Sequence, residues 1–225
     1  MAIILSIETA TTNCSVSISK AAEILVLKEH NEENYTHSEQ LHVFIDQAIK
    51  EAGILKNEID AIAVSKGPGS YTGLRIGVSA AKGLCFALDK PLIAIATLES
   101  LSHQIQPQPN EIIIPVLDAR RMEVYSAVFN SEFEQIRDTI AEVIEAESFA
   151  EYSASNKIHL IGNGAEKCKG VVAMQNVEFH TTNFPSTKEM ASIAYAKYKK
   201  GDFEDVAYFE PYYLKDFILG GGKKN

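Results

Sequence analysis

The two halves of this sequence begin in the same way, and this repetition limits the fold more than any other feature. Residues 2–8 (AIILSIE) and 111–119 (EIIIPVLDA) are apolar runs that carry an acid at or near their ends, Glu8 and Asp118. In each half two more short strands follow, at a spacing typical of an antiparallel meander, and helices and strands then alternate. The sequence therefore predicts an α/β chain made of two similar halves, although no residue-level repeat is visible.

The only proline-rich polar break in the chain is QPQPN at residues 106–110, and it marks the predicted domain boundary. We expect a first domain over residues 1–106 and a second over residues 107–225, which ends in a flexible tail. A length of 225 residues suits one large domain or two small ones. The predicted helices cover residues 37–52, 72–88, 98–105 and 186–201, and a capping box of Thr36 and Glu39 is expected to begin the first of them.

Charge and cysteine content narrow the class of protein. The net charge is −9 and the pI about 5.2, so tight binding of nucleic acid by this chain alone is not expected. The three cysteines, Cys14, Cys85 and Cys168, are far apart and show no metal-ligand spacing, which indicates a reduced, cytosolic protein. The N-terminal apolar stretch is too short for a signal peptide or a membrane span.

Residues 67–77 (GPGSYTGLRIG) join a predicted strand to a predicted helix and resemble a phosphate-binding loop. The residue types do not fit the known templates: Leu74 replaces the Walker lysine, Thr72 the third glycine of a dinucleotide loop, and Pro68 the first glycine of a nucleophile elbow. Two interpretations stay open. The loop binds an anion at the helix N-terminus, or it makes a tight turn for close packing, which we favour. The anion-binding residues would be Gly67, Gly69 and Ser70.

No catalytic residue and no metal site is predicted. No two histidines have the spacing that places both on one helix face; His37 and His42 are five residues apart and point in different directions. Glu8 and Asp118 end equivalent strands, but neither is followed by a glycine loop that would hold phosphate. Histidines at the surface or at helix ends are the simpler interpretation.

The helix after the glycine loop has small residues along one face: Gly73, Gly77, Ala80 and Leu84 recur at helical spacing, with Ile76 beside them. The opposite stripe is apolar enough to pack on the chain's own sheet. The pattern predicts an interface helix that pairs with the 37–52 helix to form half of a four-helix bundle between two proteins. The alternative is a fully internal helix.

Six motifs in chain order make the sequence resemble the TsaB (YeaZ) family, whose members take part in making threonylcarbamoyladenosine in tRNA. The resemblance spans residues 4–214. The sequence departs from the family pattern at Thr187, where family members often have alanine. The motifs are SIETATTNCSVSI (6–18), THSEQL (36–41), SKGPGSYTGLRIGVSAAKGL (65–84), DARRMEVY (118–125), FPST (184–187) and PYYL (211–214).

The resemblance implies a duplicated actin/Hsp70-like (ribonuclease H-like) α/β fold, with two domains that each have a mixed five-stranded sheet and helices. It implies a non-catalytic, cytoplasmic scaffold that forms a heterodimer with the transferase TsaD, works with the ATPase TsaE, and forms a homodimer when alone. Such a chain binds no cofactor by itself; the complex uses ATP and threonylcarbamoyl-adenylate, and tRNA is bound only through the complex. The interface residues expected are His37, Leu41, Tyr71, Thr72, Gly73, Arg75, Ile76, Gly77, Ala80 and Leu84.

Two other functions are compatible with this superfold. One is a stand-alone glycopeptidase-like hydrolase, which needs a metal site or an activated nucleophile. The other is a small-molecule kinase, which needs ATP between the two domains. The missing histidine spacing and the failed nucleophile template count against the hydrolase.

Overall fold

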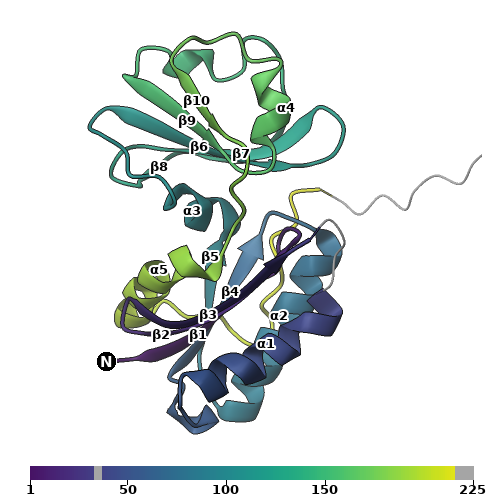
Figure 1. Cartoon of the computed structure of the whole chain (residues 1–225), viewed down its shortest axis with the longest axis vertical. Helices are drawn as coiled ribbons and strands as arrows, with labels where there is room; N and C mark the ends of the chain where they lie inside the picture. Colours follow the sequence, from purple (N-terminus) through teal and green to yellow (C-terminus); the bar gives the residue numbers. More distant parts are fainter. Residues whose placement is uncertain (33–36, 216–225) are drawn as a thin grey trace, which may run out of the picture.

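The computed structural model describes residues 1–32 and 37–215, which form two lobes joined by a narrow waist (Figure 1). The first sheet has the strand order β3-β2-β1-β4-β5. Strands β1, β2 and β3 form an antiparallel meander, and β4 and β5 continue the sheet in parallel with β1. The strands are β1 (Ile3–Glu8), β2 (Asn13–Lys20), β3 (Glu23–Asn31), β4 (Ala61–Gly67) and β5 (Leu92–Ala96).

The second sheet repeats this plan. Its order is β10-β9-β6-β7-β8, with an antiparallel meander followed by two parallel strands. The duplicated α/β architecture predicted from the sequence is therefore confirmed. The short strand β10 and the short helix α4 (Ala165–Lys169) were not predicted from the sequence. The strands are β6 (Glu111–Asp118), β7 (Glu123–Phe129), β8 (Gln135–Val143), β9 (Lys157–Ile161) and β10 (Val177–His180).

Helices α1 (His37–Glu51) and α2 (Tyr71–Leu88) cover one face of the first sheet. Because successive strand residues point to opposite faces, Leu5 packs beneath these helices while its neighbour Ile4 packs on the other side. Helix α1 ends at Glu51, and Gly53 follows with a φ of +65°, which suits glycine after a helix. Short 3₁₀ turns occur at Lys56–Glu58 and Ala150–Tyr152. The predicted capping residue Thr36 and the predicted flexible tail at residues 216–225 lie outside the described residues.

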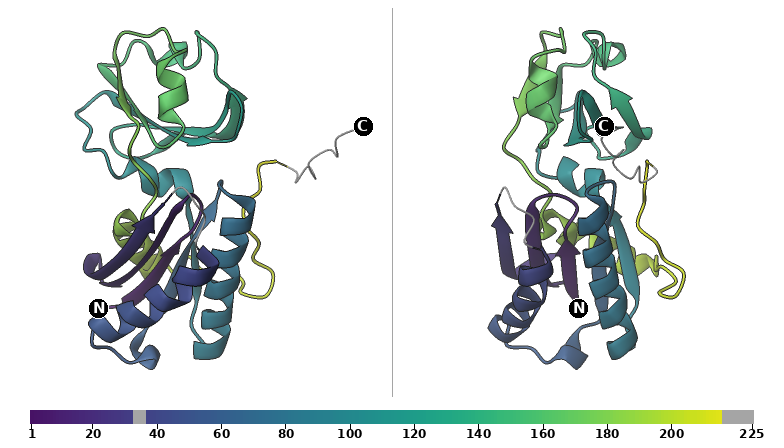
Figure 2. Two further views of the ribbon diagram at one scale, coloured as in Figure 1. Left: turned by 45° about the vertical axis from the view of Figure 1, so that its right-hand side comes forward. Right: turned by 90° about the vertical axis from the view of Figure 1, so that its right-hand side faces the viewer.

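The two domains exchange helices. Helix α3 (Thr97–Ser102) follows the first sheet in sequence, but Leu98 and Leu101 pack on the second sheet against Ile113 and Leu117. Helix α5 (Thr187–Lys200) follows the second sheet, yet it packs on the first, opposite α1 and α2 (Figure 2). The predicted domains, 1–106 and 107–225, stay a prediction, but each of these helices packs on the sheet of the other half of the chain. An apolar helix stripe predicts burial but not which sheet it covers.

Polar contacts fix the return of the chain to the first sheet. Asn13 Nδ2 donates to the Pro185 carbonyl at 2.9 Å, and the hydroxyls of Ser15 and Thr187 lie 2.8 Å apart. Ser186 is the N-cap of α5, and its hydroxyl accepts from the Lys188 amide. The polar residues of β2 therefore hold the start of α5, which explains why NCS and PST occur together in this sequence.

Three glycines let α2 approach the turn between β1 and β2. A Cβ atom at Gly69 would overlap the Ala10 carbonyl, one at Gly73 the Thr9 carbonyl, and one at Gly77 the Thr9 hydroxyl. The Thr9 hydroxyl in turn donates to the Gly73 carbonyl at 2.8 Å. Backbone therefore lies against backbone here, and only glycine leaves enough space. A Cβ at Gly83, in the same helix, would meet no atom within 4 Å.

This difference predicts opposite effects for the same substitution in one helix. Gly73→Ala should lower the free energy of unfolding by roughly 1–3 kcal/mol, because the Thr9 carbonyl would have to shift. Gly83→Ala should raise it by up to about 1 kcal/mol, since alanine is the better helix former. Urea unfolding of the three proteins measures both effects. Equal effects at the two positions would show that α2 does not pack on the Thr9 turn.

Candidate functional site

The glycine loop packs against the chain's own backbone. The Ser70 amide donates to the Ala10 carbonyl at 2.6 Å, and the Gly73 amide to the Ser70 hydroxyl, which caps α2. At Gly67 the φ angle is +108°, and a Cβ there would lie 2.8 Å from the Tyr212 carbonyl. Two amides that could bind an anion are thus already used. The arrangement favours the packing role over anion binding by Gly67, Gly69 and Ser70.

The acids that end β1 and β6 make internal contacts. Glu8 is fully buried, and its Oε1 accepts from the Ala10 amide at 2.6 Å. Burial raises the pKa of Glu8 to about 7, although the bond from Ala10 opposes this shift. Asp118 accepts from Lys167 Nζ at 2.8 Å and from the Arg120 amide at 2.6 Å. Asp118 therefore has partners in the fold, and Glu8 is held through Oε1, while its buried Oε2 has no hydrogen-bond partner among the described residues.

A surface groove of about 700 Å³ runs between α1 and α2. Small and apolar side chains form its floor: Ile76, Ala80 and Leu84 are partly buried, and Gly83 is exposed. No side chain at Gly83 fills the middle of the groove, so another helix could approach α2 closely there. The lining residues are Ser38, His42, Tyr71, Thr72, Arg75, Ile76, Ser79, Ala80, Gly83 and Leu84.

Six of the ten predicted interface residues line this groove: Tyr71, Thr72, Arg75, Ile76, Ala80 and Leu84. The other four, His37, Leu41, Gly73 and Gly77, are buried within the chain, so the small-residue face predicted at the two glycines points inward. Contact of these four residues with a partner stays a prediction. The two glycines pack on Thr9, as described above. The ring of His37 donates from Nε2 to the Thr11 carbonyl at 2.7 Å, and burial lowers its pKa.

The sequence analysis did not identify Ser38, His42, Ser79 and Gly83 as part of the groove. The sequence of α2 contains a pattern that could have identified two of them. Thr72, Ile76, Ser79 and Gly83 recur at helical spacing and so share one face of the helix. Two small-residue stripes lie side by side on this helix. Only the position of the Thr9 turn decides which stripe faces inward.

One end of the groove is held by aromatic and polar contacts from the C-terminal segment. The ring of Tyr71 lies 4.9 Å from that of Tyr213, and the Arg75 guanidinium lies 5.4 Å from the Tyr71 ring centre. Farther along α2, Lys82 Nζ donates to the Phe209 carbonyl at 2.9 Å. Residues 207–213 therefore contact α2 from Tyr71 to Lys82.

A second cavity of about 780 Å³ lies between the domains, where β8 faces the C-terminal segment. Its charged lining residues are Lys66, Asp138, Glu204 and Glu210. No histidine or cysteine is among the described residues that line it. Among the described residues, this cavity therefore offers neither a cysteine nucleophile nor a histidine base.

Comparison with known proteins agrees with this architecture. A family model described as "TsaD: tRNA N6-adenosine threonylcarbamoyltransferase" matches residues 31–220. The tRNA threonylcarbamoyladenosine biosynthesis protein TsaB of Haemophilus influenzae is 28% identical over 96% of this chain and 94% of its own. A tRNA N6-adenosine threonylcarbamoyltransferase of Staphylococcus haemolyticus is 31% identical over 61% of this chain but only 45% of its own.

Among solved structures, YeaZ from Pseudomonas aeruginosa superimposes with a TM-score of 0.82 at 25% identity, covering 95% of this chain and all of that one. This likeness confirms the duplicated actin-like fold that the sequence motifs implied. The chain thus belongs to the tRNA N6-adenosine threonylcarbamoyltransferase (TsaD) family and, within it, to the TsaB (YeaZ) type.

Proposed function

We propose that this chain is a non-catalytic subunit of the machinery that makes threonylcarbamoyladenosine in tRNA, and that it activates the transferase TsaD. One observation carries the proposal. The chain aligns over nearly its whole length with proteins named for this pathway, while its glycine loop and both strand-end acids are engaged in internal contacts. The catalytic step then belongs to a partner.

The two rival functions have less support. A cysteine nucleophile needs a lowered pKa, but burial raises the pKa of Cys14 to about 11 and that of Cys85 and Cys168 to about 12. A kinase of this superfold needs an acid that faces the cleft between the domains. Glu8 is fully buried, and Asp118 is paired with Lys167.

The groove between α1 and α2 is the proposed docking surface for TsaD. Its floor is apolar and small, and Phe86, whose exposed fraction is 87%, lies about one helical turn beyond Gly83. Exposed aromatic side chains beside a groove are typical anchors of protein interfaces. When TsaD is absent, a second copy of this chain would occupy the same surface and form a homodimer.

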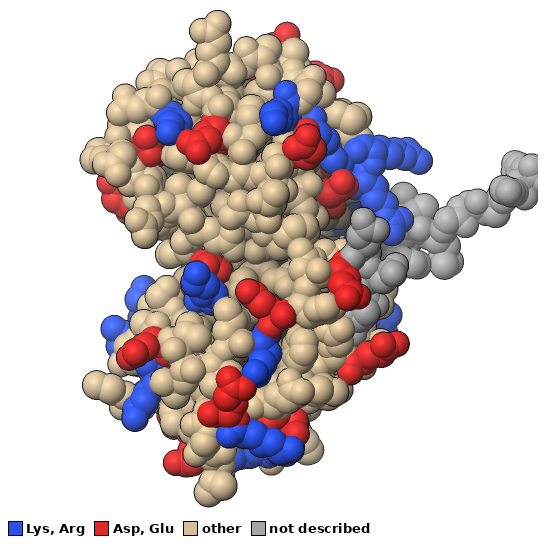
Figure 3. All heavy atoms as spheres, viewed as in Figure 1, with Lys and Arg blue, Asp and Glu red and all other residues tan. Residues whose placement is uncertain are grey.

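The remaining components follow from charge and from the family. Basic and acidic side chains are interspersed on the face shown in Figure 3, and the net charge is −9, so we propose that tRNA is held mainly by the partner. TsaE would act as the ATPase, and the complex would consume ATP and threonylcarbamoyl-adenylate in the cytoplasm. Within the described residues, no helix has the length and apolar character of a membrane span.

Reconstitution tests the proposed function directly. We expect the purified chain, supplied with threonylcarbamoyl-adenylate and tRNA, to form no threonylcarbamoyladenosine. Adding TsaD, TsaE and ATP should restore its formation, and leaving out this chain alone should abolish it. Mass spectrometry of the nucleosides from digested tRNA gives the measurement. Modification by the chain on its own would contradict the assignment as a non-catalytic subunit.

The docking surface is tested at Gly83, which lines the groove and where a Cβ atom would meet no other atom within 4 Å. Gly83→Arg should weaken binding to TsaD, and self-association, at least about 100-fold, since burying an unpaired charge costs roughly 3 kcal/mol or more. Calorimetry and sedimentation measure the two equilibria, and the thermal midpoint should not fall.

Gly170→Arg is the matched control. Gly170 ends helix α4 in the second domain, and a Cβ there also meets no atom within 4 Å. Its arginine variant should bind TsaD with unchanged affinity. Normal binding by Gly83→Arg would place the interface elsewhere on the molecule.

Glu8 offers a test that separates a structural acid from a catalytic one. Its pKa of about 7 exceeds the ordinary value of 4.5, so the folded state prefers the protonated form. The contribution of Glu8 to the free energy of unfolding should be constant below pH 4.5, fall as the pH rises from 4.5 to 7, and then level off. The total loss is roughly 3 kcal/mol.

Gln at this position cannot ionise, so Glu8→Gln should remove that pH dependence. Relative to wild type, the variant should gain roughly 3 kcal/mol in free energy of unfolding between pH 4.5 and 8. It should also still activate TsaD in the reconstituted reaction. Urea titrations at several pH values measure the first effect. A folded variant without activity would show that Glu8 has a chemical role.

A further inference from the structure

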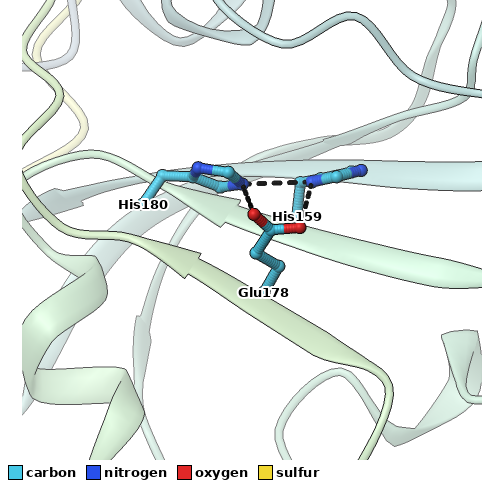
Figure 4. A group of neighbouring side chains, drawn as sticks. All are labelled: His159, Glu178 and His180. Carbon is cyan, nitrogen blue, oxygen red and sulfur yellow. Dashed lines mark hydrogen bonds and ion pairs between the residues drawn. The ribbon is translucent and has the colours of Figure 1, made fainter.

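Two histidines and a glutamate meet on one face of the second sheet (Figure 4). Strands β9 and β10 run in parallel, with Glu178 opposite His159, and His180 follows two residues later on the same face. His159 Nδ1 lies 3.1 Å from His180 Nε2 and 3.9 Å from Glu178 Oε2, and His180 Nε2 lies 3.8 Å from Glu178 Oε1. The three side chains therefore converge on one point.

These separations match those between the ligands of a transition-metal ion. Zinc binds histidine nitrogen and carboxylate oxygen at about 2.0–2.2 Å in a tetrahedron, whose edges are then roughly 3.3–3.5 Å. The observed separations, 3.1–3.9 Å, differ from that range by only a few tenths of an ångström. Two imidazoles and one carboxylate also form a donor set that zinc uses in proteins.

A fourth side chain orients the first histidine. His159 Nε2 lies 3.1 Å from Glu111 Oε2, and both side chains are largely shielded from solvent. A carboxylate that accepts from Nε2–H leaves the lone pair on Nδ1, the atom that faces His180 and Glu178. Metal-bound histidines are commonly held by such a carboxylate.

The charges around the three side chains and their exposure to solvent also suit the binding of a cation. Glu111 and Glu178 are two acids beside one cation, Lys157, whose Nζ donates to Glu178 Oε2 at 2.9 Å. Glu178 Oε1 faces His180 instead. The Glu178 side chain is 49% exposed and that of His180 23%, so an ion and a water ligand can reach the site from solvent.

We infer that His159, Glu178 and His180 bind a first-row divalent cation of the Zn²⁺ type, with Glu111 as the residue that positions His159. The ion would join β9 to β10, the four-residue edge strand after which the chain returns to the first sheet. The site goes beyond the proposed function and does not depend on it. The sequence analysis predicted no metal site because it considered helical spacing, whereas pairing of parallel strands brings residues 159 and 178 together.

Metal binding by the purified, tag-free chain tests the site. After removal of metal with a chelator, equilibrium dialysis against Zn²⁺ should give one ion per chain. Co²⁺ should produce the visible absorption of a four-coordinate site. At a Zn²⁺ concentration about 100 times Kd, the thermal midpoint should rise by roughly 5–10 °C.

Variants assign the ion to these residues. His180→Gln and Glu178→Gln change partly exposed side chains and should weaken binding more than about 100-fold. Glu111→Gln should weaken it about 10- to 100-fold, as expected for a supporting carboxylate. Lys157→Gln should strengthen binding, because it removes the cation that competes for Glu178. Circular dichroism confirms that each variant folds.

His30→Gln is the matched control, since His30 also lies beside an acid, 2.8 Å from Glu32, but outside this cluster. It should keep one ion per chain with unchanged affinity. The inference is overturned if the wild-type chain binds neither Zn²⁺ nor Co²⁺. It is equally overturned if binding persists in His180→Gln and Glu178→Gln at the wild-type affinity.

Discussion

The close approach of helix α2 to the turn at Thr9 and Ala10 determines much of the first domain. Three glycines of the loop and helix allow this contact, and it has two effects. It uses the amides of Ser70 and Gly73 for internal hydrogen bonds, which favours packing over anion binding by the loop that resembles a phosphate site. It also sets the rotation of α2, which turns one small-residue stripe inward and leaves the other beside α1 as a groove.

Most of the architecture could be predicted from local sequence patterns. The apolar runs at residues 2–8 and 111–119 gave both central strands, and helical spacing gave α1, α2 and α5. What could not be predicted depends on contacts between distant segments. The stripe of α5 indicates burial without indicating which sheet it covers, and VEFH at residues 177–180 is too short to identify a strand. Gly73 and Gly77 were assigned to the wrong side because either stripe of α2 could have faced outward.

The residues of the candidate site were likewise predictable only where they lie on one element. The sequence placed six groove residues on α2, but Ser79 and Gly83 of the same helix were missed, as were Ser38 and His42 of α1. The cluster at His159 is a stronger example, because its members are neighbours only through the pairing of β9 with β10. Spacing along the chain identifies sites on one element, and sites made by strand pairing require the register.

The exchange of α3 and α5 has a consequence for how the chain folds during synthesis. One face of the first sheet stays uncovered until α5 has been made, and α5 ends at Lys200 of a chain of 225 residues. Ile4, Ala63 and Ile93 are on that face and would be exposed to solvent in the meantime. A sheet that is covered by a segment distant in sequence folds slowly, and its exposed apolar face is prone to aggregation. The nascent chain should therefore depend on chaperones, and an N-terminal half expressed by itself should be insoluble.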